Sequence, residues 1–171
     1  MTGTTAGRPG LLSPEFIALI TSGVSTIVAS HDASGRPSLM RAVGAATTPD
    51  GTRITVYLNR PACPQLLADL QATGQIAVVF SEPFSHRAVQ VKACRVELRA
   101  AGPEDAPVLA RYLAGMEHEL GRIGFGPDYT RTMLAYQLGD VAAVSFSPEQ
   151  AFDQTPGPKA GASLPPAGGM A

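Results

Sequence analysis

Six short segments dominated by β-branched and other apolar residues limit this chain to a small set of folds. Segments of this kind indicate β-strands, and residues 32–37 (DASGRP) have the turn composition expected between the first two. The predicted strands are residues 24–31, 38–45, 53–58, 75–81, 86–99 and 141–146. Most connections are too short for a parallel crossover, so antiparallel pairing is expected. We therefore predict a mainly β fold with α, a six-stranded antiparallel split barrel with flanking helices, because closure removes exposed strand edges.

Helical patterns lie before and between the strands. Ser13-Pro14-Glu15 combines an N-cap, a proline at the first helical position and an acid in the first turn. A helix is therefore predicted to begin there and to end at Gly23. Further helices are predicted over residues 63–73, from Pro103 to about Leu120, and over 129–136.

The two ends of the chain differ in composition from its middle. Residues 154–171 (QTPGPKAGASLPPAGGMA) are rich in proline and glycine and carry few apolar side chains. Such a segment has little burial to set against an ordering cost of roughly 1–2 kcal/mol per residue. We expect a flexible N-terminus over residues 1–10, one split-barrel domain over 11–153 and a disordered Pro/Gly-rich tail over 154–171.

The charge balance of the 171 residues argues against several kinds of partner. Thirteen Lys and Arg against fourteen Asp and Glu offer no basic field for nucleic acid or for an anionic membrane surface. No apolar run is long enough to span a bilayer, and the first residues lack the pattern of a secretory signal. Two cysteines cannot form a disulfide framework. We therefore expect a reduced, cytoplasmic protein without nucleic-acid or membrane partners.

Several motifs that would assign a chemistry are absent from the sequence. It contains no GxxxxGK[ST], GxGxxG or GxSxG motif. His31, His86 and His118 lie far apart and share no metal-ligand spacing with Cys63 and Cys94, so no metal site is expected. Packing is the expected role of both cysteines, and no side chain is identified as a general acid or base. The catalytic residues therefore remain unassigned.

Polar side chains occur on predicted strands where a plain core would favour apolar ones. Arg41 lies between apolar neighbours, and a guanidinium cannot be buried without a partner. Gln90 and Lys92 share one face of the strand over 86–99. Tyr57 and Asn59 end a strand just before a helix start, where free backbone N–H groups favour an anion. These residues indicate either a phosphate-bearing ligand held by Arg41 and Lys92, or a barrel with both cations on a solvated face.

Taken in order, these elements resemble the FMN-binding split barrel of the pyridoxamine 5'-phosphate oxidase-like superfamily, over residues 13–148. The resemblance rests on Arg41-Ala42-Val43 in the second strand and on Val56-Tyr57-Leu58-Asn59 at the end of the third. It also rests on residues 86–93 (HRAVQVKA) of the long strand and on the closing strand before Ser147-Pro148.

The resemblance implies a homodimer that holds FMN in a cleft where the two subunits meet. By this likeness Arg41 would contact the FMN phosphate, and the backbone of Ala42 and Val43 would pass the isoalloxazine ring. Tyr57 and Leu58 would border the same cofactor. The full set of expected cofactor-binding residues is Arg41, Ala42, Val43, Tyr57, Leu58, Asn59, Arg60, Gln90 and Lys92.

The sequence departs from the family at the position that binds the FMN phosphate. Members that bind FMN strongly usually carry Ser-Arg-Lys at the helix after the third strand, where this chain has Ala62-Cys63-Pro64-Gln65 preceded by Arg60. Each missing charge-assisted contact is worth on the order of 1.5–3 kcal/mol. Ala88 replaces a glutamine that contacts the flavin, and the tail lacks the Arg and His that bind pyridoxal phosphate. Pyridoxamine 5'-phosphate oxidase activity is therefore not expected.

Function hypotheses of different classes follow from this resemblance. The first is a flavin-dependent oxidoreductase that acts on an unknown small molecule, with FMN supplying the redox chemistry. The alternative is a non-flavin split-barrel protein that binds haem, a deazaflavin or another phosphorylated ligand. A third hypothesis is a dimeric scaffold whose cleft holds nothing.

Overall fold

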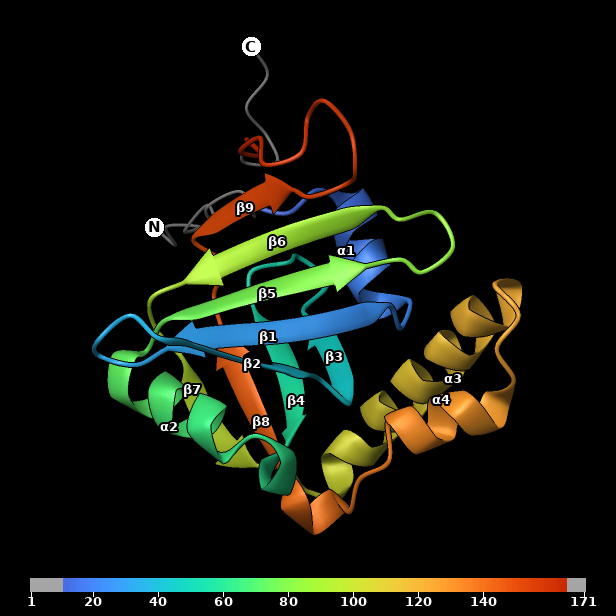
Figure 1. Cartoon of the computed structure of the whole chain (residues 1–171), viewed down its shortest axis with the longest axis horizontal. Coiled ribbons are helices and arrows are strands. Elements are labelled where there is room, and N and C mark those ends of the chain that lie inside the picture. Colours follow the sequence, from blue (N-terminus) through green and yellow to red (C-terminus); the bar gives the residue numbers. More distant parts are fainter. Residues whose placement is uncertain (1–10, 166–171) are drawn as a thin grey trace, which may run out of the picture.

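The computed structural model describes residues 11–165, which form two antiparallel sheets flanked by helices (Figure 1). The strands are β1 (Ser25–His31), β2 (Pro37–Arg41), β3 (Gly44–Thr47), β4 (Ile54–Asn59), β5 (Ile76–Ser81), β6 (Ala88–Ala93), β7 (Glu97–Ala100), β8 (Val141–Phe146) and β9 (Gln150–Asp153). The helices are α1 (Pro14–Thr21), α2 (Pro64–Thr73), α3 (Ala106–Arg122) and α4 (Pro127–Met133). One sheet has the strand order β2-β1-β5-β6-β9, and the other has the order β3-β4-β8-β7.

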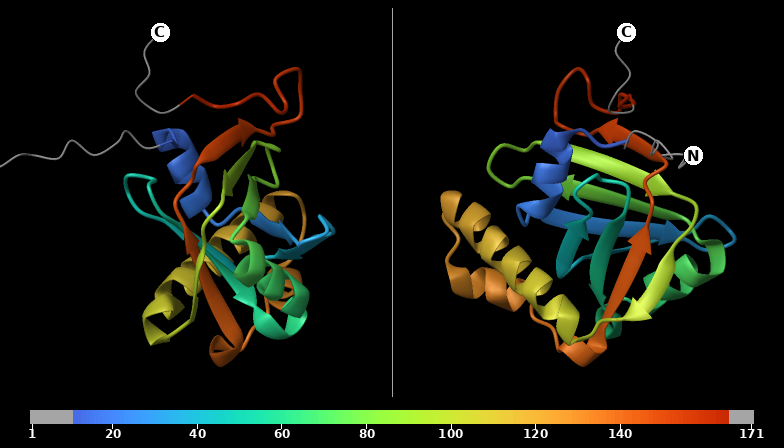
Figure 2. Two further views of the ribbon diagram at one scale, coloured as in Figure 1. Left: turned by 90° about the vertical axis from the view of Figure 1, so that its left-hand side faces the viewer. Right: turned by 180° about the vertical axis from the view of Figure 1, so that it is seen from behind.

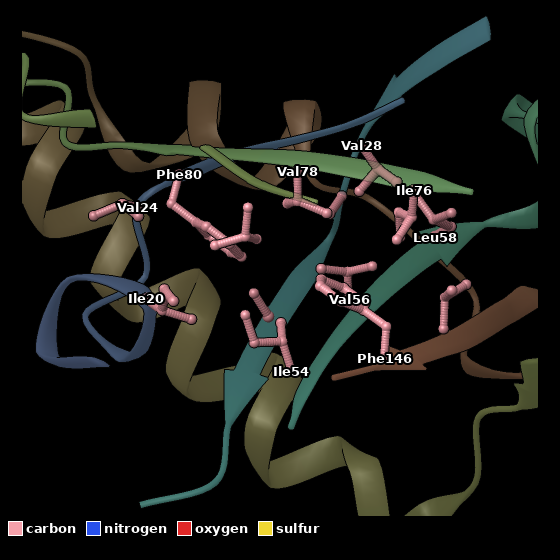
Figure 3. Close-up of a cluster of buried hydrophobic side chains, with 14 of the residues drawn as sticks. Ile20, Val24, Val28, Ile54, Val56, Leu58, Ile76, Val78, Phe80 and Phe146 are labelled. Atoms are coloured by element: carbon pink, nitrogen blue, oxygen red, sulfur yellow. The ribbon is translucent and has the colours of Figure 1, made fainter. Parts of the chain in front are cut away.

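The two sheets pack face to face around one apolar core (Figure 3). Burial alternates along β1 and β5, so each of these strands turns every second side chain toward the core. Val28, Val78 and Phe80 of the five-stranded sheet pack in one cluster with Val56 and Phe146 of the four-stranded sheet. The alternate side chains of each strand face outward, and they determine the chemical character of the outer face of each sheet.

The chain passes from one sheet to the other within segments that the sequence predicts as single strands. After β2, the Ala42 N–H donates to the Thr26 carbonyl in the five-stranded sheet at 2.9 Å. The Val43 N–H donates to the Tyr57 carbonyl in the four-stranded sheet at 2.8 Å. The predicted strand 38–45 is therefore divided into β2 and β3. Both sheets bury side chains against the same core, so the apolar pattern continues through the crossing and does not reveal it.

The predicted number of six strands was wrong, and the described residues form no closed barrel, whereas the antiparallel pairing is confirmed. The predicted strand 86–99 also divides, into β6 and β7, and β9 adds a further strand after β8, so residues 11–165 contain nine strands. Within these residues the strand orders leave β2, β9, β3 and β7 at sheet edges. The sheets are linked by chain crossings rather than by closure.

The predicted helices are confirmed, with one shift. Ser13 caps α1, its hydroxyl oxygen accepting from the Phe16 N–H at 3.4 Å, and Gly74 ends α2 with a left-handed φ of +70°. The pattern over 129–136 corresponds to α4, which begins earlier at Pro127 and forms a hairpin with α3. The right-hand view of Figure 2, seen from behind, shows this hairpin at one end of the molecule and α1 in front of the five-stranded sheet. No helix in residues 11–165 combines the length and apolar character needed to cross a membrane.

Residues 154–165, the first part of the expected tail, fold back along β9. The Leu164 N–H donates to the Ala151 carbonyl at 2.8 Å, and the Asp153 N–H donates to the Ala162 carbonyl at 2.9 Å. The Leu164 side chain also packs against the core. Backbone bonds to an edge strand order this segment, and its composition does not reveal them. The predicted flexible N-terminus, 1–10, and residues 166–171 of the predicted tail lie outside the described residues.

Candidate functional site

The outer face of the five-stranded sheet is not covered by any helix of residues 11–165 (Figure 1). In the strand register Arg41 lies opposite Ile27, Ile27 opposite Val79, and Val79 opposite Gln90, which makes one row of outward side chains. The neighbouring row consists of Leu39, Ala29, Ala77 and Lys92. We call these two rows the open face. The structure therefore places Arg41, Gln90 and Lys92 on one surface.

The polar groups of the open face do not converge within one chain. Strands in a sheet are about 4.8 Å apart, so Arg41 and Gln90, three strands from each other, are separated by roughly 14 Å. The Gln90 Oε1 accepts a hydrogen bond from Gln154 Nε2 at 3.4 Å, and Lys92 Nζ lies 5.0 Å from the centre of the Phe152 ring. One small anion therefore cannot contact Arg41 and Lys92 of the same chain.

Arg41 lies at the end of β2 without a negatively charged partner. Its Nη1 donates to the Ser25 hydroxyl at 2.7 Å, which uses one of the five guanidinium N–H donors. No carboxylate of residues 11–165 is within ion-pair distance of it. The side chain is partly buried. A cation in this position has free donors that suit a phosphate or a carboxylate.

A hollow of about 260 Å³ lies beside Arg41, and we call it the Arg41 hollow. Ser25, Arg41 and Ser81 line its sheet side, and Ser25 and Ser81 are cross-strand partners. The hairpin of α3 and α4 forms the other side, with Tyr129 among its lining residues, and His86 of the β5–β6 loop completes the rim. Sequence reasoning missed this helical wall because no local pattern indicates where a hairpin docks.

A second hollow, of about 280 Å³, includes Lys92 and lies toward the other end of the open face. His31, Cys94 and Glu149 contribute to its lining. The Asp32 carbonyl, 2.8 Å from Nδ1, raises the pKa of His31, and Glu149 raises the pKa of the Cys94 thiol. A raised pKa favours the protonated thiol of Cys94, which is the less nucleophilic form. Within residues 11–165 no three His, Cys, Asp or Glu side chains are grouped to hold a metal ion.

Ala42 and Val43, expected to pass a flavin ring, lie at the crossing between the sheets. Their side chains are buried, and both backbone N–H groups are used in the sheet hydrogen bonds described above. In the single chain these residues fix the backbone next to Arg41 and present little surface of their own.

Tyr57 takes part in a buried polar network on the outer side of the four-stranded sheet. Its hydroxyl donates to Asp105 Oδ1 at 2.8 Å, and Arg99 donates to both Asp105 oxygens at 2.6 and 2.7 Å. The Gly102 N–H adds a bond of 2.9 Å to Oδ2. Burial raises the pKa of Tyr57 strongly, and the Arg99 guanidinium lowers the pKa of Asp105. Tyr57 therefore stabilises the fold and is closed to a ligand in the single chain.

The remaining expected residues lie at the end of β4 and just after it. Leu58 is fully buried in the core, and the Asn59 carbonyl accepts a bond from the Cys63 thiol at 3.2 Å. Arg60 is exposed and lines a third hollow, of about 210 Å³, where its Nη2 is 3.3 Å from the Gly139 carbonyl oxygen. Arg41, Lys92 and Arg60 thus line three separate hollows of the described part of the chain.

No protein-family model matches the sequence, and no curated protein matches it. Solved structures match it in fold. One is HupZ of Group A Streptococcus, with 16% identity, a TM-score of 0.54, and 88% of this chain and 99% of that chain covered. Another is a candidate pyridoxamine 5'-phosphate oxidase of Lactobacillus delbrueckii, with 16% identity, a TM-score of 0.52, and 82% and 93% covered. A third is an F420 reductase, with 14% identity, a TM-score of 0.53, and 78% and 93% covered.

These similarities confirm the resemblance at the level of the fold. The chain has the fold of the pyridoxamine 5'-phosphate oxidase-like split barrels. The named neighbours differ in their ligands and activities, so the fold alone does not select one of them.

Proposed function

We propose that this protein binds FMN between two copies of the chain and acts as an oxidoreductase on an unknown small molecule. The observation that carries the proposal is Arg41, partly buried beside a hollow, with free donors and no carboxylate partner in residues 11–165. A guanidinium in such a place is costly unless an anion pairs with it, and it matches a phosphate with two parallel hydrogen bonds. The fold shared with an F420 reductase and a candidate pyridoxamine 5'-phosphate oxidase supports a cofactor of this class.

The open face supports a second copy of the chain as the other half of the site. Leu39 is 64% exposed there, and Ile27 and Val79 are partly exposed. Covering this apolar surface gains about 25 cal/mol per Å². In a two-fold dimer the same face meets itself, and an axis that runs along the strands would interchange the β2 and β6 ends of this face. The partner's Lys92 would then lie toward Arg41, across a distance that one chain does not close.

The residues present fit one end of FMN, its phosphate. Arg41 would bind that phosphate, and Ser25 would hold the guanidinium in place through the bond of 2.7 Å. The second copy would exclude water from the site. Bound FMN supplies hydride and electron transfer, and the chain supplies binding and orientation.

The start of α2 supports the alternative of a ligand other than FMN. The N-cap position, Cys63, makes no side-chain capping bond, and no basic residue lies in the first turn of the helix. The nearby Arg60 points its Nη2 toward the Gly139 and Val141 carbonyl oxygens, at 3.3 and 3.4 Å. The start of α2 therefore offers little second grip on a phosphate, and the alternative ligands are haem, a deazaflavin or another phosphorylated molecule held by Arg41.

The experiment is a titration of the purified protein with FMN, coenzyme F420 and haem, followed by absorbance and fluorescence. We expect FMN to bind at micromolar concentration and Arg41→Ala to lower the affinity at least tenfold, because a charge-assisted contact of about 1.5–3 kcal/mol is lost. Arg36→Ala is the matched control, since Arg36 is an exposed arginine in the turn that leads into β2. It should leave the affinity unchanged.

Two outcomes would count against the proposal. Wild-type protein that takes up F420 or haem but no FMN would move the assignment to the alternative. An equal FMN affinity in Arg41→Ala and Arg36→Ala would remove Arg41 from the site, whatever ligand is bound.

A further inference from the structure

The Arg41 hollow has two ends of different chemistry, and the first is polar and cationic. Arg41 is anchored to Ser25, and Ser81 lies opposite Ser25 across the strand pair. Two hydroxyl groups and the free guanidinium donors therefore face the same space. This end can hold one anionic group through several hydrogen bonds.

The second end is aromatic and comes from the hairpin of α3 and α4. The rings of Phe125 and Tyr129 are stacked, with centroids 4.6 Å apart and planes 29° from parallel. They are 42% and 51% exposed, although both line the hollow. Met116 and Met133 supply a polarisable wall beside them. Large rings left this exposed next to a cavity offer a stacking surface for another ring.

The backbone holds this aromatic pair in place. The Phe125 N–H donates to the Leu120 carbonyl at 3.0 Å, and the Tyr129 N–H donates to the Gly126 carbonyl at 3.1 Å. Gly124 takes a left-handed φ of +93°, which allows the chain to turn back at this point. The rings therefore belong to an ordered turn and require little rearrangement before a ligand binds.

His86 adds a hydrogen-bonding side chain at the rim of the hollow. It is the non-glycine residue of the described chain with a positive φ, +61°, in the loop between β5 and β6. Its N–H donates to the Glu82 carbonyl at 2.9 Å, which closes that loop. A non-glycine residue held in the left-handed region costs free energy and is often found where a site positions a side chain.

The size of the hollow limits the ligand. Its volume of about 260 Å³ is below the range of about 300–1,000 Å³ that whole drug-sized ligands occupy. The space suits one planar ring system with one anionic group, and it does not suit a dinucleotide.

We propose that the Arg41 hollow binds a planar aromatic anion, whose charged group pairs with Arg41 and whose ring packs on Tyr129 and Phe125. The inference rests on the proposed function in one respect, the anion-binding role of Arg41. The ligand that carries this chemistry is either the flavin itself, through its phosphate and ring, or a separate aromatic acid that takes the place of the flavin at Arg41. The α3–α4 hairpin thus becomes the element that selects aromatic ligands.

The test measures binding of 2-naphthoate, an aromatic carboxylate, by calorimetry on wild-type protein and on four variants. Tyr129→Ala should weaken binding roughly three- to tenfold, in line with the value of an aromatic contact. Tyr129→Phe keeps the ring and should bind as the wild type does. Arg41→Ala should lose at least tenfold. Phe84→Ala is the matched control, because Phe84 is an aromatic residue of similar exposure, 50%, outside the lining of the hollow.

A second arm repeats the titration on protein saturated with FMN. Loss of naphthoate binding would show that FMN occupies the Arg41 hollow. Retained binding would show that FMN binds elsewhere and that the hollow takes a separate aromatic acid. FMN affinity is also measured in Tyr129→Ala. The exposed position of Tyr129 leaves the fold intact, and the thermal unfolding midpoint of each variant verifies this.

The outcomes separate this inference from the proposed function. Naphthoate binding that depends on both Arg41 and Tyr129, in a protein that takes up no FMN, supports the hollow and removes the flavin assignment. FMN binding that depends on Arg41, with neither probe affected by Tyr129→Ala, retains the proposed function and overturns the inference. Absence of naphthoate binding at millimolar concentration, with unchanged FMN affinity in Tyr129→Ala, overturns it as well.

Discussion

The outer faces of the two sheets differ, because a helix covers one of them and leaves the other exposed. On the four-stranded sheet, α3 packs Leu109 against Tyr57 and Val43, and the polar groups beneath it are bound to one another. We call this the covered face. On the five-stranded sheet, Leu39 is 64% exposed, and Arg41 faces a hollow whose far wall is the α3–α4 hairpin. No helix of residues 11–165 lies over the middle strands of this outer face (Figure 1).

Charged groups show the difference most clearly. Asp105, on the covered face, receives hydrogen bonds from Arg99, from Tyr57 and from the Gly102 backbone. Arg41, on the open face, has one neutral hydroxyl as its partner in residues 11–165. A polar group that the chain satisfies by itself contributes to folding, whereas one that it leaves unsatisfied has interaction energy available for a ligand. We therefore expect stability to depend on the covered face and ligand binding to depend on the open face.

The largest expected effect is on the covered face, in Asp105→Ala. Removing the carboxylate leaves the buried Tyr57 hydroxyl and the Gly102 N–H without a partner, and it frees the Arg99 charge. We expect a loss of about 3 kcal/mol in the free energy of unfolding, measured by denaturant titration. The midpoint of thermal unfolding should fall by roughly 6–12 °C. Glu104→Ala is the control, because Glu104 is exposed and 3.8 Å from Arg99, and its loss should be below about 1 kcal/mol.

The pH dependence of this loss distinguishes a charge effect from a packing effect. Arg99 lowers the pKa of Asp105 in the folded state, so the stabilisation is present above the unfolded pKa, about 3.9, and is lost as the pH falls through the folded pKa. The difference between wild type and Asp105→Ala should stay constant from neutral pH to about pH 5 and shrink in stronger acid. A difference that persisted unchanged at low pH would contradict the charge network as its cause.

A smaller effect is expected on the open face, in Leu39→Asp. Each dimer would carry two new carboxylates in an apolar contact, which should raise the dimer dissociation constant at least tenfold, or about 1.4 kcal/mol. Sedimentation velocity over a range of concentrations measures this constant. Ile123→Asp is the control, since Ile123 is 43% exposed but lies at the end of the α3–α4 hairpin. A wild-type protein that sediments as a monomer would contradict the open face as a dimer surface.

The smallest effect concerns His31, in the hollow that includes Lys92. The Asp32 carbonyl and then the Gln75 side chain raise its pKa above 6.5. Protonated His31 therefore adds stability below pH 6.5, and this contribution is lost as the pH rises through the raised pKa. An NMR titration of the imidazole should give a midpoint above 6.5 that moves down in Gln75→Ala. A titration midpoint at or below 6.5 in the wild type would contradict this prediction.

Much of the fold could be predicted from local sequence. β1, β4, β5 and β8 lie within a residue or two of their predicted positions, because β-branched runs bounded by turns mark them directly. The crossings at Ala42 and after β6 were not predicted, because each occurs within one continuous β-like segment that contains no glycine–proline turn signal. β9 and the segment that follows it were missed for another reason, since their order depends on backbone bonds to distant strands.

The candidate site was only partly accessible from the sequence. Arg41 was identified because a cation within an apolar strand is unusual, and the structure places it beside a hollow. Tyr57 was selected because it lies near the end of a strand just before a helix start, but its hydroxyl is bonded to Asp105, a residue 48 positions away, and no local pattern reveals such a partner. Phe125 and Tyr129 gave no signal, because aromatic residues near a helix end are common and their meeting with Arg41 depends on how the hairpin docks.

The crossing between the sheets has a consequence for how this scaffold can change over evolution. Arg41 is the last residue of β2, and the next two backbone N–H groups are bonded to different sheets. The main chain at this point is thus tied down from two directions, independently of the side chain at position 41. Substitutions at position 41 can therefore change which ligand is bound without changing the backbone. The same fold can in this way support different chemistries through one variable residue.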